Sequence, residues 1–120
     1  MKGLTYIQRV SVMRILLDII FADSKVDHRE QLLFDQIASS LGLDETVKSD
    51  VENLNSLIAL AQIHDFTLEQ KKEFAKLMGM MIIVDKDINY NEVVIYNVVN
   101  DFCGIKIDFM LEDYSEYTMS

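Results

Sequence analysis

The sequence predicts an all-α protein, a compact bundle of about seven helices that forms a single domain over residues 1–120. The chain has no proline and only four glycines, which argues against a loop-rich protein. Apolar residues recur three or four positions apart, and Asp, Asn or Thr precedes most of these runs, where it would cap a helix. Half of the residues are hydrophobic, and a chain of 120 residues is long enough to bury a core.

The first predicted helix covers residues 4–22 and is almost entirely apolar. Its polar residues lie three or four positions apart, so they form one narrow stripe along the helix. The stripe consists of Gln8, Ser11, Arg14 and Asp18. A helix with so little polar surface is expected at the centre of the bundle, covered on most sides.

Polar caps and glycines define the next predicted helices. Asp27, followed by Glu30 three positions later, forms a carboxylate variant of the capping box at the start of the second helix. This helix is expected to end at Gly42, because glycine readily adopts the left-handed conformation at a helix C-terminus. Asp44 follows as the cap of a third, shorter helix.

A fourth helix is predicted to start at Asn55 or Ser56. Thr67 and Gln70 form another capping box, which opens a long helix that reaches about Val84. The first half of this long helix is basic, whereas its second half is apolar all round and is therefore expected to be buried.

The last long helix is predicted to begin at a further capping pair, Asn89 and Glu92, and to run to Cys103. Gly104 follows it as a stop signal. The remaining segment, residues 106–120, is acidic and is predicted to form one more short helix or a strap.

An internal repeat becomes visible when the chain is shifted against itself by 62 residues. The two predicted units cover about residues 12–43 and 74–105, and each reads helix–acidic turn–helix. The matches fall at the turn, the cap, the core face and the final glycine. They include Asp23 with Asp85, Val26 with Ile88, Asp27 with Asn89, Glu30 with Glu92, Leu33 with Ile95, and Gly42 with Gly104.

The two acidic turns resemble a known family. Residues 22–27 read Ala-Asp-Ser-Lys-Val-Asp with Glu30 downstream, and residues 84–89 read Val-Asp-Lys-Asp-Ile-Asn with Glu92 downstream. Both are similar to the Ala-Asp-Gly-x-(Ile/Val)-x-x-x-Glu pattern of TerB-like domains, which occur in tellurite-resistance proteins and before the J-domain of DjlA-type co-chaperones. The resemblance covers roughly residues 5–105.

This resemblance implies an all-helical fold, acidic clusters suspected of binding metal ions, and a link to stress phenotypes such as tellurite resistance. The sequence departs from the pattern at three positions. Ser24 and Lys86 replace the glycine of the motif, and Val84 replaces the alanine of the second unit. No His-Pro-Asp motif of a J-domain is present in the sequence.

The acidic turns are candidates for a divalent-cation site, with calcium, manganese or zinc as the ion. The candidate ligands are Asp23, Asp27, Glu30, Asp85, Asp87, Asn89 and Glu92. Hard cations such as calcium bind six to eight oxygen atoms, which several carboxylates on short turns could supply. The second turn even opens like an EF-hand loop, but Tyr90 stands where that loop needs glycine and Tyr96 where it needs glutamate. A full EF-hand is therefore excluded, and a different cation site remains a hypothesis.

A structural interpretation explains most of the same residues. Asp27 with Glu30, and Asn89 with Glu92, would satisfy free backbone amides as capping boxes. Acidic side chains in the first turn of a helix are also stabilised by the positive end of the helix dipole. Asp23 and Asp85 fit this interpretation less well, because they follow the end of a helix, where negative charge is unfavourable unless they accept hydrogen bonds from turn amides.

Other reactive residues do not form a recognisable site. Cys103 occupies the repeat position of Leu41, so it is expected to be a buried and inert thiol. His28 and His64 have no second His or Cys at ligand spacing. The sequence contains no glycine-rich phosphate loop and no evident nucleophile–base pair, so we expect a protein that is not an enzyme and that needs no cofactor.

The charge balance restricts the partners. The formal net charge is −9, which argues against nucleic acid and favours a protein partner with a basic surface. Arg9, Arg14 and Asp18 interrupt the N-terminal apolar stretch, so neither a signal peptide nor membrane insertion is expected. A single cysteine is typical of a reducing compartment, and we expect a cytoplasmic protein.

Overall fold

The computed structural model describes residues 1–114. This part of the chain contains six α-helices, two 3-10 turns and no β-strand, which confirms the all-α class. The elements are α1 (Tyr6–Ala22), α2 (His28–Ser40), η1 (Glu45–Val47), α3 (Lys48–Asn53), α4 (Ser56–His64), α5 (Leu68–Ile83), α6 (Tyr90–Cys103) and η2 (Leu111–Tyr114).

The prediction of about seven helices is not confirmed, since the described residues after α6 contain a short 3-10 turn and no further α-helix. The backbone of this segment is held instead by side chains of α6. The Tyr96 hydroxyl donates to the carbonyl of Ile107 (2.7 Å), and the Ile107 amide donates to Asn100 Oδ1 (3.0 Å). These bonds satisfy the backbone polar groups that a helix would otherwise have paired internally. Residues 115–120 of the predicted acidic segment lie outside the described residues.

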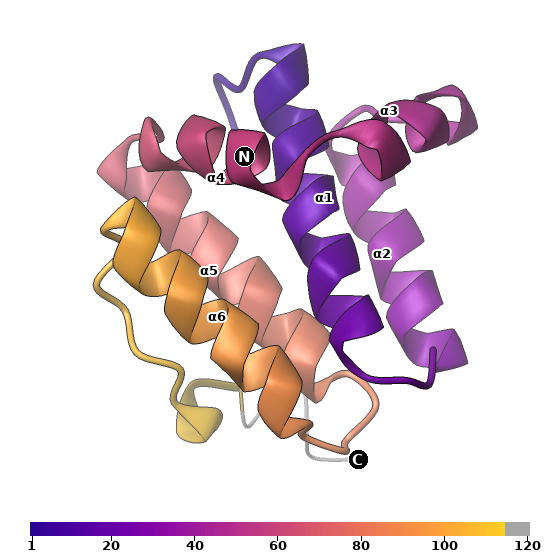
Figure 1. The fold of residues 1–120 in the computed structure, drawn as a ribbon, viewed down its shortest axis with the longest axis vertical. Coiled ribbons are helices and arrows are strands. Elements are labelled where there is room, and N and C mark those ends of the chain that lie inside the picture. The colour runs from indigo at the N-terminus through magenta and orange to yellow at the C-terminus, as the bar shows by residue number, and fades with distance from the viewer. Residues whose placement is uncertain (115–120) are drawn as a thin grey trace.

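Helix α1 lies at the centre of the bundle, as its narrow polar stripe predicts. It contacts all five other helices, with α2 and α3 on one side, α5 and α6 on the other, and α4 crossing over one end (Figure 1). The buried core includes Leu16 and Ile19 of α1 together with Phe74, Met78 and Tyr96 of the surrounding helices. The fold is thus organised around one nearly apolar helix.

The polar stripe of α1 is less exposed to solvent than the sequence suggests. Ser11 is fully buried and donates to the carbonyl of Ile7 (2.7 Å). Arg14 and Asp18 form an ion pair with each other. Arg14 also donates to the carbonyl of Glu52 (3.0 Å), and Asp18 accepts from Ser56 (2.6 Å). The stripe therefore fixes the α3–α4 connection onto α1 instead of facing water.

Most of the predicted helix ends are confirmed. Capping boxes are present at Asp27 and at Thr67, and both Gly42 and Gly104 have positive φ angles. The structure adds a capping box at Thr5, which makes α1 begin at Tyr6 rather than at residue 4.

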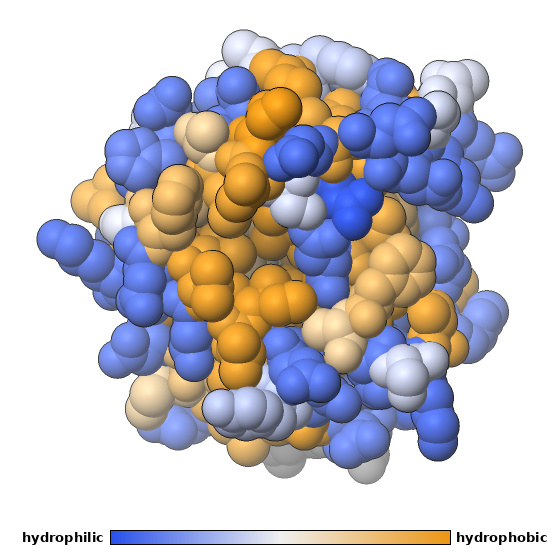
Figure 2. All heavy atoms as spheres, in the orientation of Figure 1, coloured by the Kyte–Doolittle hydropathy of each residue, from blue (hydrophilic) through white to orange (hydrophobic). Residues whose placement is uncertain are grey.

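Apolar side chains remain exposed on one face of the bundle. Figure 2 shows them gathered where α4 and α6 lie toward the viewer, between hydrophilic residues. These two helices carry exposed Leu57, Ile58, Val98 and Phe102. Among the described residues, no helix combines the length and the apolar character that crossing a membrane requires.

Candidate functional site

The two acidic turns lie at the same end of the bundle, the α1–α2 turn beside the α5–α6 turn (Figure 1). The side-chain Nδ2 of Asn91 in α6 donates to the carbonyl of Ala22 at the end of α1 (3.4 Å), and this hydrogen bond connects the two regions. The helices that follow these loops, α2 and α6, each carry a glutamate in their first helical turn. These two residues, Glu30 and Glu92, lie in this region. The sequence-predicted candidates therefore come from two segments about 60 residues apart that lie at the same end of the bundle.

Glu30 of α2 is buried, with 1% of its surface exposed. Its Oε1 accepts from the amide of Asp27 (3.0 Å), as expected for a capping box. Its Oε2 is buried and has no donor among the described residues as long as the neighbouring Glu92 carboxyl is ionised. Capping accounts for only one of the two oxygens.

Glu92 of α6 is also 1% exposed, and here the predicted capping box is absent. Asn89 caps α6 alone, by accepting from the amide of Asn91 (2.8 Å). The Glu92 carboxyl lies instead against the Glu30 carboxyl, and neither of its oxygens has a donor when both groups are ionised. The second turn thus leaves its glutamate without the structural role that the sequence suggests.

The glutamate pair retains a proton. Burial, the hydrogen bond to Glu30 and the negative charges of Glu30, Asp85 and Asp23 together raise the pKa of Glu92 to about 9. Burial also raises the pKa of Glu30, although the amide of Asp27 and the hydrogen bond from Glu92 oppose this rise. A proton on Glu92 lets its hydroxyl donate to Glu30, which is the favourable state of two carboxyls in contact.

Asp23 and Asp85, which fitted the structural interpretation less well in the sequence, each accept a hydrogen bond from an amide of their own turn. Asp23 Oδ1 accepts from the amide of Lys25 (3.3 Å), and Asp85 Oδ1 accepts from the amide of Asp87 (3.1 Å). Burial raises the pKa of Asp85, and the charges of Asp27 and Asp87 raise it further. Both aspartates lie close enough to Glu92 for their charges to raise its pKa.

The other three predicted ligands are engaged elsewhere. Asp27 caps α2 and also accepts from Arg29 Nε (3.0 Å) and Nη2 (3.1 Å), and this side-chain bond is the main reason why its pKa is lowered. Asp87 is exposed, and Asn89 caps α6. Within residues 1–114, no group of three or more His, Cys, Asp or Glu side chains is gathered closely enough to hold a metal ion in this arrangement.

The remaining sequence-predicted residues behave as ordinary structural groups. Cys103 is fully buried, and burial raises the pKa of its thiol to about 11, which confirms the expectation of a buried thiol. The exposed His64 ring packs edge-on against Phe102, with ring centroids 6.5 Å apart.

The sequence analysis missed one feature, a cavity of about 340 Å³ between α1, α2, η1 and α3. Its lining includes Leu17 and Phe34, which periodicity assigns to core-facing positions. Both side chains are only half-buried because α3 does not cover them completely. No sequence signal separates a core position that is covered from one that lines a groove.

Comparison with known proteins supports the fold and leaves the family open. No protein-family model matches the chain. An alignment 97 residues long, which covers 73% of this chain, is 32% identical to part of the ATP phosphoribosyltransferase regulatory subunit of Nostoc punctiforme and spans only 22% of that protein. The structure resembles a protein of unknown function from Porphyromonas gingivalis W83, with a TM-score of 0.77, 17% identity and 98% of each chain covered. The chain is therefore similar to a complete solved helical protein in fold, and to about a fifth of a curated relative in sequence.

Proposed function

We propose that the chain is a non-enzymatic, TerB-like helical module that responds to a divalent cation bound by Glu30 and Glu92 with help from Asp23 and Asp85. The observation that carries this proposal is the pair of buried glutamates, Glu30 and Glu92, whose three inward oxygens have no donor from the rest of the described residues and depend on a proton shared between the two carboxyls. Buried polar atoms are nearly always satisfied in native proteins, so each exception calls for a physical explanation.

A purely structural role does not account for this arrangement. Leaving a buried polar group unpaired costs about 1–3 kcal/mol, and more when the group is charged. Glu92 does not cap its helix, and an apolar residue could fill the same space without this cost. A shared proton pairs one oxygen of Glu92 with Glu30 and leaves the other oxygen unsatisfied, whereas a cation can bind several oxygens at once.

Cation binding by this site requires movement. Two glutamates are too few to satisfy calcium, which takes six to eight oxygen ligands. The nearest further carboxylates, Asp23 and Asp85, lie on the two turns and would have to swing toward the glutamate pair. Since Asp23 follows α1 and Asp85 follows α5, binding would reposition the ends of these helices, which is the basis of a cation-dependent response.

Titration calorimetry with calcium, manganese and zinc chloride tests the proposal on the full chain. We expect binding tighter than millimolar in the wild type and at least about tenfold weaker binding in Glu92→Gln, which keeps the shape and removes the charge. Asp87→Asn is the matched control, because Asp87 is an exposed acid of the same turn. Absence of binding tighter than millimolar, or equal affinities of the wild type and Glu92→Gln, would overturn the proposal.

A second candidate function is that of an acidic protein-interaction module whose turns are purely structural. The net charge of −9 favours this function, because it attracts a partner with a basic surface. The similarity to part of a regulatory subunit is compatible with either non-catalytic role. A cytoplasmic location, which rests on the single cysteine, and a role in a stress response such as tellurite resistance, which rests on the sequence resemblance alone, complete the proposal.

A further inference from the structure

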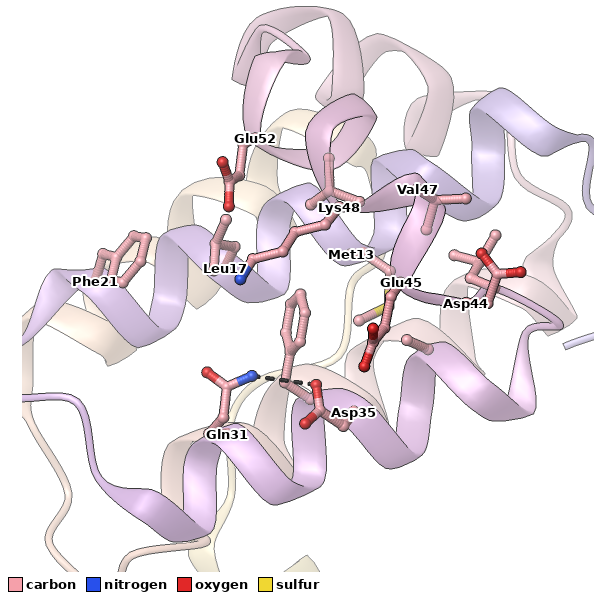
Figure 3. A pocket seen from close by; sticks show the side chains of 14 residues that line it. Met13, Leu17, Phe21, Gln31, Asp35, Asp44, Glu45, Val47, Lys48 and Glu52 are labelled. Atoms are coloured by element: carbon pink, nitrogen blue, oxygen red, sulfur yellow. Dashed lines mark hydrogen bonds between the residues drawn. The ribbon is translucent and has the colours of Figure 1, made fainter.

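The cavity between α1, α2, η1 and α3 forms an open groove on the bundle, referred to here as the α1–α2 groove. Helix α1 lines one side with Met13, Leu17 and Phe21, and α2 lines the other from Gln31 to Ala38 (Figure 3). The 3-10 turn η1 and helix α3 close the third side. The groove extends over about two turns of α1, which corresponds to roughly 12 Å.

The floor of the groove is apolar. It is built from the half-buried side chains of Leu17, Phe34 and Val47, above the fully buried side chains of Met13 and Val51. At one end stands Phe21, whose ring is 59% exposed although it belongs to the most apolar helix of the protein. A contiguous apolar hollow with a protruding aromatic residue is typical of a surface that receives an apolar side chain.

The rim of the groove is acidic. Four carboxylates surround the opening and come from three different elements: Asp35 of α2, Asp44 and Glu45 at η1, and Glu52 of α3. Lys48 is the single basic residue of the lining. Figure 3 shows its side chain extending from α3 toward Leu17 of α1. The groove therefore combines an apolar floor with a rim on which negative charge dominates.

We infer that the α1–α2 groove is a docking site for a basic amphipathic helix of another protein. The chemistry of the two surfaces is complementary, because such a helix places apolar anchors on one face and Lys or Arg beside them. The anchors would enter the space over Leu17 and Phe34, and the basic side chains would reach the carboxylates of Asp35 and Glu52. This inference rests on the groove alone and does not depend on the proposed cation site.

The size of the groove restricts the occupant. A volume of about 340 Å³ is at the lower end of the range for ligand pockets, so it suits a few aliphatic side chains better than a large cofactor. A length of about two helical turns matches anchors at positions i, i+3 or i+4, and i+7 of a docked helix. A short amphipathic segment would thus fill the groove from end to end.

Fluorescence anisotropy with a defined probe tests the inference on the full chain in metal-free buffer. The probe is a labelled peptide of about 14 leucines and lysines whose leucines lie on one helical face. A peptide of the same composition with its leucines distributed around the helix serves as the control probe. We expect the facially ordered peptide to bind at least about tenfold more tightly, and its affinity to fall between about 50 and 300 mM salt.

Two protein variants locate the binding site. Asp35→Lys with Glu52→Lys reverses the rim, whereas Asp101→Lys with Glu112→Lys makes the same change of net charge at exposed acids outside the groove. We expect the first pair to weaken binding at least about tenfold more than the second. Ala38→Phe, which fills the groove and leaves the rim charges unchanged, should also abolish binding. Thermal melting of each variant verifies that it is folded.

The inference fails if the two probes bind equally, or if rim and control reversals have the same effect, because the peptide would then respond only to the net charge. It also fails if the chain itself forms a dimer that the rim reversal dissolves, since the occupant would then be a second copy. Cation binding measured by calorimetry is a separate readout, so either proposal can be rejected without the other.

Discussion

Replacing Glu92 by glutamine should remove most of the pH dependence of stability that the buried carboxyl pair creates. The carboxyl of Glu92 is 1% exposed, and its pKa is raised from an ordinary 4.5 to about 9 by burial and by the neighbouring Glu30. Glutamine has nearly the same shape, has no charge and can donate to Glu30 as the protonated acid does. The variant therefore resembles wild-type protein whose Glu92 is permanently protonated.

The sign of the effect follows from the raised pKa. Between the two pKa values the folded protein keeps a proton that the unfolded chain releases, so the free energy of unfolding falls as the pH rises. The contribution is fully present below about pH 4.5 and is lost as the pH approaches 9. For one proton the slope is at most about 1.4 kcal/mol per pH unit, so the loss from pH 5 to pH 8 is up to about 4 kcal/mol.

Urea unfolding followed by circular dichroism at several pH values, with a chelator present, measures this effect. We expect the wild type to lose stability from about pH 5 to pH 8, and Glu92→Gln to lose at least 1 kcal/mol less. Asp87→Asn, which removes an exposed acid of the neighbouring turn, should follow the wild-type profile. Parallel profiles for the wild type and Glu92→Gln would refute the reasoning, because Glu92 would then titrate alike in the folded and unfolded states.

Three further predictions concern packing, backbone conformation and reactivity. Gly79→Ala should destabilise the fold by about 1–3 kcal/mol, because the new Cβ would lie 1.9 Å from the Tyr114 hydroxyl oxygen. This clash outweighs the better helix propensity of alanine. A double-mutant cycle with Tyr114→Ala, measured by urea unfolding, should show strong coupling between the two positions. Lys106→Gly should raise the free energy of unfolding by about 0.5 kcal/mol, because glycine adopts the left-handed conformation of this position (φ 62°) without steric strain. The relieved strain outweighs the added entropy of the unfolded chain. Lys106→Ala should give no such gain. Cys103 should react with Ellman's reagent only as fast as the protein opens, because its thiol is buried with a pKa of about 11; rapid stoichiometric labelling of the native protein would contradict this.

The helix starts and stops were predictable because they depend on local chemistry. A side-chain oxygen at Asp27 or Thr67 satisfies amides two or three residues away, so the sequence alone identifies the cap. The central position of α1 was predictable for a similar reason, since a helix that is apolar on nearly all sides has to be covered. For the segment after Gly104 the sequence left a short helix and a strap as alternatives, because its conformation depends on hydrogen bonds with Tyr96 and Asn100 of another element.

For the acidic turns, the sequence pattern picked out the two glutamates that meet, but not their geometry, and the cation site itself stays a prediction. Matching Glu30 with Glu92 in the repeat selected the two residues that meet. The same pattern suggested identical capping roles, and the structure shows that only Glu30 has one. Whether the Glu92 carboxyl turns to its own backbone or to a partner helix depends on tertiary packing, which spacing does not reveal. The α1–α2 groove was not predicted for the same reason, since the partial exposure of Phe34 depends on tertiary packing and not on the spacing of apolar residues.

The central position of α1 also affects the order in which the protein can fold. During synthesis α1 is made before every helix that covers it, yet α5 and α6 supply a large part of its apolar contacts. The nascent chain must therefore carry part of the apolar surface of α1 uncovered until α6 is complete, about 80 residues after the end of α1. Because transiently exposed apolar surface promotes aggregation, this delay makes α1 a segment at risk of aggregation before folding is complete.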